Sequence, residues 1–250
     1  ETIASRMVKN NRILVMEPTT TAWMYYSPDQ EGDFNNTKGK TEQIFNSFNT
    51  LLSELEKAQV EYDLGCENIV MNHGRVDKKE LIVGQRSYDL ILLPENFENF
   101  ERGVFDLLIK YLKNGGKVIS LSGYPSYLDG NFSQEAKHSL ISIGKYWQNI
   151  KEINALPLKE LSTHDSFEPI NPGAWNGNVF HHRRKFKDGN LFFFINYDTV
   201  DVSMVHFLIK GTEIAEFDPF SGSINKFNKE NKDNKLDVEF ELYPSNSKLL

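Results

Sequence analysis

Carboxylates are the side chains of this sequence that could act as general acids or bases. Two of them at a suitable separation can cleave a glycosidic bond, one as the acid and the other as base or nucleophile. The sequence does not give the separation between the candidates, and carboxylates near strand ends commonly cap loops or pair with lysine. We therefore assign no catalytic residue. The candidate carboxylates are Glu17, Asp63, Glu67, Glu95 and Asp129.

A cysteine or serine nucleophile would lie on a sharp turn after a central strand, with a histidine as its partner. The corresponding segment reads SLSGYPSYL around Ser122; it contains no cysteine and lacks the small residues that flank such a turn on both sides. Cys66 is the single cysteine, which excludes an internal disulfide and a thiolate metal cluster within this chain. We interpret Cys66 as an ordinary buried thiol and do not pair it with His73.

His181 and His182 are adjacent on a predicted strand. Their side chains point to opposite faces, so they cannot bind one metal ion together. His182, Arg184 and Phe186 share one face of that strand. This face could contact an acidic or sugar partner, but a solvated hairpin face is the simpler interpretation, and we favour it.

The elements that would position these residues alternate between strands and helices up to about residue 150. Apolar runs at 13–16 and 88–93 end at prolines, alternation indicates a strand at 59–64, and VISLS at 118–122 directly follows a helix. This order predicts βαβ units and a parallel sheet with helices on both faces. We predict a flavodoxin-like α/β domain over residues 10–165, with strand order 2-1-3-4-5.

Three helices are predicted between these strands. Apolar residues at helical spacing from Ile44 to Leu55 mark the first, with Thr41 as its N-cap after a long loop. The second, at about 100–112, ends at Asn114–Gly116, where a glycine can supply a left-handed residue. The third lies around 136–147, and no segment after it reads clearly as a fifth strand.

From about residue 175 the pattern becomes purely β, after a stretch at 167–177 that contains proline and glycine. We predict an antiparallel β-sandwich-like domain over 175–250, incomplete as a sandwich, with Asp188–Gly189 as a hairpin turn. Such a sheet needs another surface to cover it. The predicted strands are 179–187, 190–197, 202–209, 212–217, 224–228 and 236–243.

Ligands of doubly wound folds bind at the carboxyl ends of the strands, where the loop after the first strand would meet the residues after the third. A flavodoxin-type flavin site needs a short, hydroxyl-rich loop that runs straight into the first helix, but roughly twenty residues intervene here. The glycine-rich phosphate motifs are also absent from the sequence, so we expect no cofactor. The candidates for contact with a substrate or an interface are Thr20, Trp23, Tyr25, Tyr26 and Glu95.

Composition limits the classes of function. Hydrophobic residues make up 39% and charged residues 25%, as in a globular chain with a packed interior. The net charge of -7 provides no basic field for a phosphate backbone, so we expect no nucleic-acid partner. No apolar run reaches the roughly 18–20 residues that span a bilayer, so we expect no membrane span. Because the chain begins at Glu1 rather than Met, we interpret it as a fragment.

Four segments together resemble a known domain. They are RILVMEPTTTAWMYYSP from Arg12, QVEYDLGCENIV from Gln59, LIVGQRSYDLILLPE from Leu81 and NGGKVISLSGYPSYLDG from Asn114. They resemble the non-catalytic α/β domain of large bacterial multidomain glycoside hydrolases of the α-L-rhamnosidase-like kind. That domain is similar to the trimerisation domain of some β-galactosidases and is glutamine-amidotransferase-like. The later strands, with turns at Asn196–Tyr197 and 218–222, resemble the β segment that follows it.

The resemblance implies a parent enzyme that cleaves glycosidic bonds with paired carboxylates on a barrel outside these residues. This chain would then be a structural or accessory part, with the missing catalytic barrel and carbohydrate-binding domains of the same parent, and an oligosaccharide, as candidate partners. A secreted or periplasmic parent is implied. Trp23, Tyr25 and Tyr26 would seal a domain interface or form one wall of the substrate pocket, and we favour the interface.

Two alternatives stay open. The first is a stand-alone carbohydrate-binding module that uses the β domain. The second is a small-molecule enzyme or flavoprotein that uses the strand-end crevice of the α/β domain.

Overall fold

The computed structural model describes residues 8–9, 11–26, 37–164, 167–175, 177–186, 189–232 and 234–250. The chain divides into two compact units. The α/β unit comprises the described residues within 11–52 and 62–156, and the β unit comprises those within 1–10, 53–61 and 157–250. The domain limits predicted from the sequence stay predictions. None of the helices described is long and apolar enough to cross a membrane.

A five-stranded parallel sheet forms the centre of the α/β unit, and its order β12-β9-β7-β2-β3 is the predicted 2-1-3-4-5. β2 and β7, two of the three inner strands, are buried along their whole length, since helices cover both faces of the sheet. The flavodoxin-like prediction is confirmed. The strands are β2 (Ile13–Met16), β3 (Tyr62–Gly65), β7 (Leu90–Leu93), β9 (Lys117–Ser120) and β12 (Trp147–Asn149).

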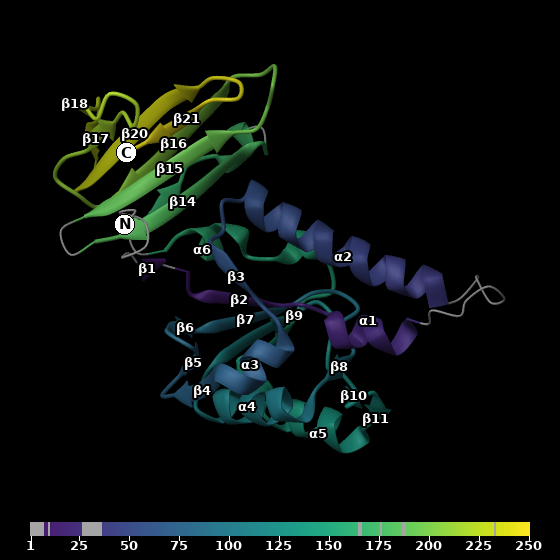
Figure 1. Cartoon of the computed structure of the whole chain (residues 1–250). Helices are drawn as coiled ribbons and strands as arrows, with labels where there is room; N and C mark the ends of the chain where they lie inside the picture. The colour runs from purple at the N-terminus through teal and green to yellow at the C-terminus, as the bar shows by residue number, and fades with distance from the viewer. Residues whose placement is uncertain are drawn as a thin grey trace. The chain divides into compact units, whose positions relative to one another are not determined.

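Helices lie on both sides of this sheet (Figure 1). On one side are α1 (Thr19–Tyr25) and α2 (Thr37–Lys57), and on the other are α3 (Glu67–His73), α4 (Arg102–Lys113) and α5 (Gln134–Ser142). The second predicted helix is confirmed as α4. It ends as expected: Gly115 has φ of 91° and donates its N–H to the carbonyl of Leu112, which stops the helix.

The fifth strand begins at Trp147, where a helix was predicted. Ser133 caps α5 by accepting a hydrogen bond from the N–H of Ala136, and the helix ends at Ser142. A 3-10 turn at Gly144–Tyr146 follows. The Trp147 ring is then buried against the sheet, and its Nε1 donates to the carbonyl of Gly123 at 3.2 Å. This tertiary contact decides the end of the helix.

The prediction of one long loop that ends at a Thr41 N-cap is wrong. Threonines 19–21 form the first turn of α1, and α2 begins at Thr37. Threonine is a weak helix former, but Thr20 and Thr21 are buried in α1 and hydrogen-bonded to distant residues. Tertiary bonds therefore outweigh local propensity. Residues 27–36 of the predicted loop lie outside the described residues.

Short strands that the sequence did not indicate join these main elements. An antiparallel sheet of β4 (Gly74–Asp77), β5 (Glu80–Val83) and β6 (Arg86–Tyr88) follows α3. A second small sheet contains β8 (Asn99–Phe100), β10 (Tyr127–Leu128) and β11 (Asn131–Phe132), and a 3-10 turn spans Ile153–Ala155. Because these strands are only two to four residues long, they show no clear alternation of their own.

The β unit contains two four-stranded sheets that share an aromatic core. Phe192 and Phe194 of the first sheet stack on Phe207 of the second, with ring centroids 5.5 and 5.4 Å apart. The first sheet has β1 (Val8–Lys9), β14 (Val179–Lys185), β15 (Asn190–Asn196) and β21 (Ser247–Leu249). The second has β13 (Glu168–Pro169), β16 (Ser203–Ile209), β19 (Glu230–Lys232) and β20 (Lys235–Leu242).

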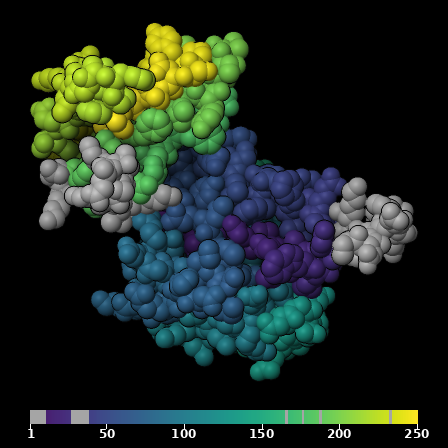
Figure 2. Space-filling view, viewed as in Figure 1, coloured from purple at the N-terminus to yellow at the C-terminus, as the bar shows by residue number. Residues whose placement is uncertain are grey.

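The β unit contains further short elements beside these two sheets. β14 and β15 pair as the predicted hairpin, although Asp188 of its turn lies outside the described residues. β17 (Ala215–Phe217) and β18 (Ile224–Lys226) form a separate hairpin, whose yellow-green atoms are on the surface in Figure 2. The short helices α6 (Leu158–Ser162) and Pro172–Trp175 precede β14.

Candidate functional site

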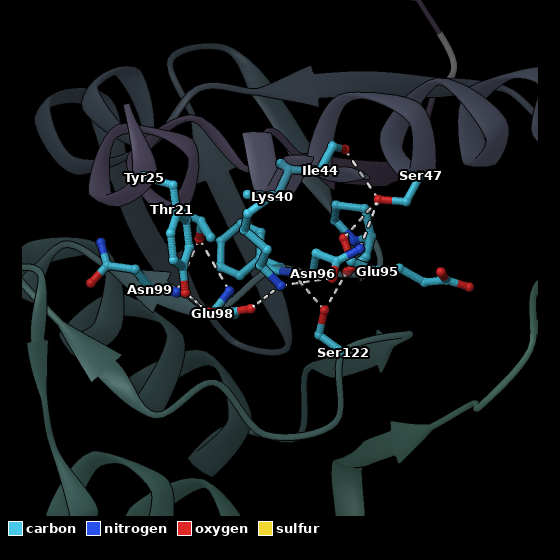
Figure 3. Close-up of polar contacts among 12 residues, drawn as sticks. Thr21, Tyr25, Lys40, Ile44, Ser47, Glu95, Asn96, Glu98, Asn99 and Ser122 are labelled. Carbon is cyan, nitrogen blue, oxygen red and sulfur yellow. Dashed lines mark hydrogen bonds and ion pairs between the residues drawn. The ribbon is translucent and has the colours of Figure 1, made fainter. Parts of the chain in front are cut away.

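Polar side chains gather at the carboxyl edge of the parallel sheet, as the sequence predicted (Figure 3). α1 follows β2, and the loop at 94–101 follows β7. The Thr21 hydroxyl accepts hydrogen bonds from the N–H groups of Glu98 at 3.1 Å and Asn99 at 3.0 Å. Thr21 is fully buried, so α1 is held directly on the backbone of the loop.

Lys40 of α2 lies between two polar groups of the same loop. Its Nζ is 2.6 Å from Glu98 Oε1 and donates to Asn96 Oδ1 at 3.0 Å. Tyr25 donates its hydroxyl to Glu98 Oε2 at 2.5 Å, and Lys40 Nζ lies 5.7 Å from the centre of its ring. Burial, together with this bond to Glu98, raises the pKa of Tyr25 to about 12. Tyr25 is therefore a hydrogen-bond donor at neutral pH rather than a general base.

Two serines hold the other side of the loop. Ser47 of α2 donates to the carbonyl of Glu95 at 3.2 Å and accepts from Asn96 Nδ2 at 3.2 Å. Ser122 donates to the carbonyl of Pro94 at 2.7 Å and accepts from the N–H of Phe97 at 2.6 Å. Both hydrogen-bonding functions of the Ser122 hydroxyl are thus used by backbone groups, which fits a positioning role.

A buried carboxyl group lies beneath α1. Glu67 is 2% exposed; Oε1 accepts from the Thr20 hydroxyl, and Oε2 accepts from the N–H of Glu101 at 2.8 Å. Asn99 Nδ2 donates to the Thr20 hydroxyl at 3.1 Å. Burial is the main cause that raises the pKa of Glu67 to about 7; the charges of Glu101 and Asp129 add to it, and the two hydrogen bonds oppose it.

The five residues predicted to contact substrate or an interface have different surroundings. Thr20 and Tyr25 belong to the network, and Glu95 enters it through its carbonyl oxygen. Trp23 and Tyr26 are each 66% exposed. That any of these five residues contacts a substrate or an interface stays a prediction.

Sequence reasoning missed Lys40, Glu98 and Asn99 as members of the network. Lys40 lies 56 residues from Asn96 in the chain, so no local pattern links them. The signal that was available is topological: residues after neighbouring parallel strands meet at one edge.

Two of the other candidate carboxylates form structural contacts. Asp63 accepts hydrogen bonds from Asn11 at 2.8 Å, Tyr88 at 3.0 Å and Arg86 at 3.3 Å. Asp129 accepts from the N–H of Arg102 at 2.8 Å. The described residues contain no group of three or more histidine, cysteine or acidic side chains that could hold a metal ion.

No family model and no curated protein sequence matches this chain. Solved structures do match it. The fold recurs within glycoside hydrolases. A rhamnosidase from Novosphingobium sp. PP1Y matches with 13% identity and a TM-score of 0.55, over 75% of this chain and 19% of its own. An exo-carrageenase from Bacteroides ovatus matches with 14% identity and a TM-score of 0.58, over 96% of this chain and 28% of its own.

A β-galactosidase from Bacillus circulans sp. alkalophilus also matches, with 8% identity and a TM-score of 0.57, over 98% of this chain and 42% of its own. At these identities the likeness establishes the fold. The chain therefore spans less than half the length of the solved glycoside hydrolases described here.

Thr21→Val should lower the free energy of unfolding by about 2 kcal/mol. The substitution keeps the shape of the side chain but leaves the N–H groups of Glu98 and Asn99 without their acceptor, and an unsatisfied buried donor costs about 1–3 kcal/mol. Urea denaturation followed by circular dichroism measures the loss. Thr19→Val is the matched control, since Thr19 is only partly buried. Equal losses in both variants would contradict a special role for the Thr21 hydroxyl.

Proposed function

We propose that this chain is a non-catalytic accessory part of a multidomain glycoside hydrolase of the α-L-rhamnosidase-like kind, which acts in carbohydrate degradation. One observation carries the proposal. At the edge where doubly wound folds bind ligands, the side chains of Thr21, Glu98 and Ser122 form hydrogen bonds with other segments of the α/β unit rather than facing an open site. Side chains used in this way hold a scaffold together.

The geometry next to β2 favours a structural role rather than a flavin site. A flavodoxin-type phosphate loop would run from the strand straight into a long helix. Here the short helix α1 follows β2, and the hydroxyls of Thr20 and Thr21 bind the protein itself. This chain is similar in fold to solved glycoside hydrolases that extend well beyond the matched region. That similarity supports a parent chain with further domains.

The proposed partners are the catalytic barrel and the carbohydrate-binding domains of the parent chain. The exposed rings of Trp23 and Tyr26 supply apolar surface for such a contact. Together with Tyr25 they would seal a domain interface or form one wall of the substrate pocket. A secreted or periplasmic parent belongs to the same proposal.

The test is turnover of a panel of aryl glycosides, including an α-L-rhamnoside and a β-galactoside, by this chain and by the full-length parent in parallel. We expect the parent to hydrolyse at least one member of the panel and this chain to hydrolyse none. The sugar that the parent accepts would identify its specificity. Turnover by this chain alone would overturn the accessory role and direct attention to Glu17 and Glu95.

A further inference from the structure

The helix α1 is attached to the rest of the α/β unit by polar side chains. Its two buried side chains are those of Thr20 and Thr21, while Trp23 is 66% exposed. Thr21 accepts from the backbone of the loop at 94–101, and Tyr25 donates to Glu98 of the same loop (Figure 3). A helix of seven residues is not stable in water by itself. The closed position of α1 therefore depends on these hydrogen bonds.

The Glu67 carboxyl joins α1 to two other segments. Oε1 is hydrogen-bonded to the Thr20 hydroxyl of α1, and Oε2 accepts from the N–H of Glu101, the N-cap residue of α4, at 2.8 Å. The Thr20 hydroxyl also accepts from Asn99 Nδ2 of β8 at 3.1 Å. β8 and α4 each bury apolar side chains, whereas the buried side chains of α1 are threonines. Among these three segments, α1 is therefore the one that can open with the smallest loss of packing.

The charges that act on Glu67 are negative. Glu101 and Asp129 both disfavour its ionised form, and Oε2 of Glu101 is buried with no hydrogen-bond partner among the described residues. Arg102 Nε lies 4.0 Å from Asp129, which offsets part of that charge. α1 brings no charged side chain to this site, and the Cys66 thiol precedes Glu67 at the N-cap of α3. Ionisation of Glu67 therefore adds a negative charge to a buried site beside two other carboxyl groups.

We propose that α1 is a pH-sensitive latch, which the neutral Glu67 carboxyl holds closed on the α/β unit and which opens when that carboxyl ionises. In the closed form the pKa of Glu67 is about 7, chiefly because the group is buried. Opening admits water, so the pKa returns towards 4.5. Since the closed form has the higher pKa, its advantage is complete below pH 4.5 and is lost as the pH rises through 7.

The latch belongs to the α/β unit alone, since all of its residues lie within that unit. Its consequence for an interface rests on the proposed function. Trp23 and Tyr25 are part of the helix that opens, so their position on the surface depends on pH. If they meet another domain of the parent, that contact is stronger in mild acid than above neutral pH.

The test is hydrogen exchange, followed by nuclear magnetic resonance, on the intact 250-residue chain at pH 5 and pH 8. The protection factor divides the exchange rate of an unfolded chain by the measured rate, which removes the intrinsic effect of pH. We expect the α1 amides, among them Ala22, which donates to the carbonyl of Pro18, to lose protection by about 50–100-fold between these two pH values. The amides of Leu108 and Leu112 in α4 should be better protected than those of α1 at both.

Low concentrations of urea separate a local opening from unfolding of the whole unit. A latch exposes little surface when it opens, so exchange in α1 should change little with urea, whereas exchange in α4 should accelerate. Equal protection of α1 and α4, with the same response to urea, would overturn the latch, because α1 would then open only when the unit unfolds. This measurement uses the unsubstituted protein and does not depend on the folding of a variant.

Glu67→Gln tests the carboxyl itself. Its amide does not ionise, so the protection of α1 should stay within about twofold between pH 5 and pH 8. Glu42→Gln, an exposed carboxyl on α2, should keep the full loss seen in the unsubstituted protein. A loss in Glu67→Gln as large as in the unsubstituted protein would assign the effect to another group and overturn the proposal. Because these measurements use neither a sugar nor the parent chain, their outcome is separate from that of the glycoside panel.

Discussion

Arg183→Met should lower the free energy of unfolding of the β unit by about 3–5 kcal/mol, the usual cost of removing one partner of a buried ion pair. Arg183 of β14 is fully buried, and its Nη2 and Nε lie 2.5 and 3.1 Å from the two carboxylate oxygens of Glu61. The substitution would take the guanidinium away from the buried Glu61 carboxylate. Chemical denaturation at pH 7, followed by the near-ultraviolet signal, measures the loss.

The matched control is Arg184→Met, the next residue on the same strand. Its Nε has no hydrogen bond within the described part of the chain, so we expect a change below about 1 kcal/mol. Glu61→Leu combined with Arg183→Met should recover much of the stability lost in the single variant, because it removes both charges. A single variant as stable as the control would show that the pair contributes little.

The same pair should make the β unit sensitive to acid. Burial alone would raise the pKa of Glu61, but His181 and Arg183 outweigh it and lower the pKa from 4.5 to about 2. Since the folded pKa is the lower one, the stabilisation is present above pH 4.5 and is lost as the pH falls towards 2. Glu61→Gln should remove this acid dependence.

Glu67→Gln should abolish a pH dependence of opposite sign in the α/β unit. The folded pKa of Glu67, about 7, lies above its ordinary value of 4.5, so the neutral acid is favoured in the folded protein. The contribution of Glu67 to the free energy of unfolding is complete below pH 4.5 and is lost as the pH rises through 7, a change of about 3 kcal/mol. We therefore expect the variant to be more stable than the unsubstituted protein at pH 8, by about 2 kcal/mol, and similar to it at pH 5.

Glutamine suits this test because it resembles the neutral acid. It keeps an oxygen that can accept from the N–H of Glu101 and gains an amide that can donate to the Thr20 hydroxyl. Urea denaturation at pH 5, 6, 7 and 8 gives the slope for each variant. Glu42→Gln, an exposed carboxyl on α2, is the control and should keep the unsubstituted slope. The same slope in Glu67→Gln would refute the assignment to this carboxyl.

Much of the fold could be predicted from the sequence, because its signals are local. The apolar runs that form β2 and β7, the periodicity of α4 and its glycine stop each depend on residues a few positions apart. The preference for right-handed crossovers limits the possible orders of the parallel strands, and the flavodoxin-like order was chosen among those that remain. The edge of the sheet where polar residues gather could be predicted for the same reason.

The sequence by itself determined the α/β and β classes, and the strand order chosen from it indicated the edge that holds the polar network. Only the tertiary structure decided that the threonines of α1 form a helix, that Trp147 begins the fifth strand, and that Glu61 meets Arg183, 122 residues away. The physical reason is common to all three. A buried hydroxyl, ring or charged group is stabilised by the hydrogen-bond, packing or ion-pair partner that it meets in the folded protein. These partners lie far away in the sequence.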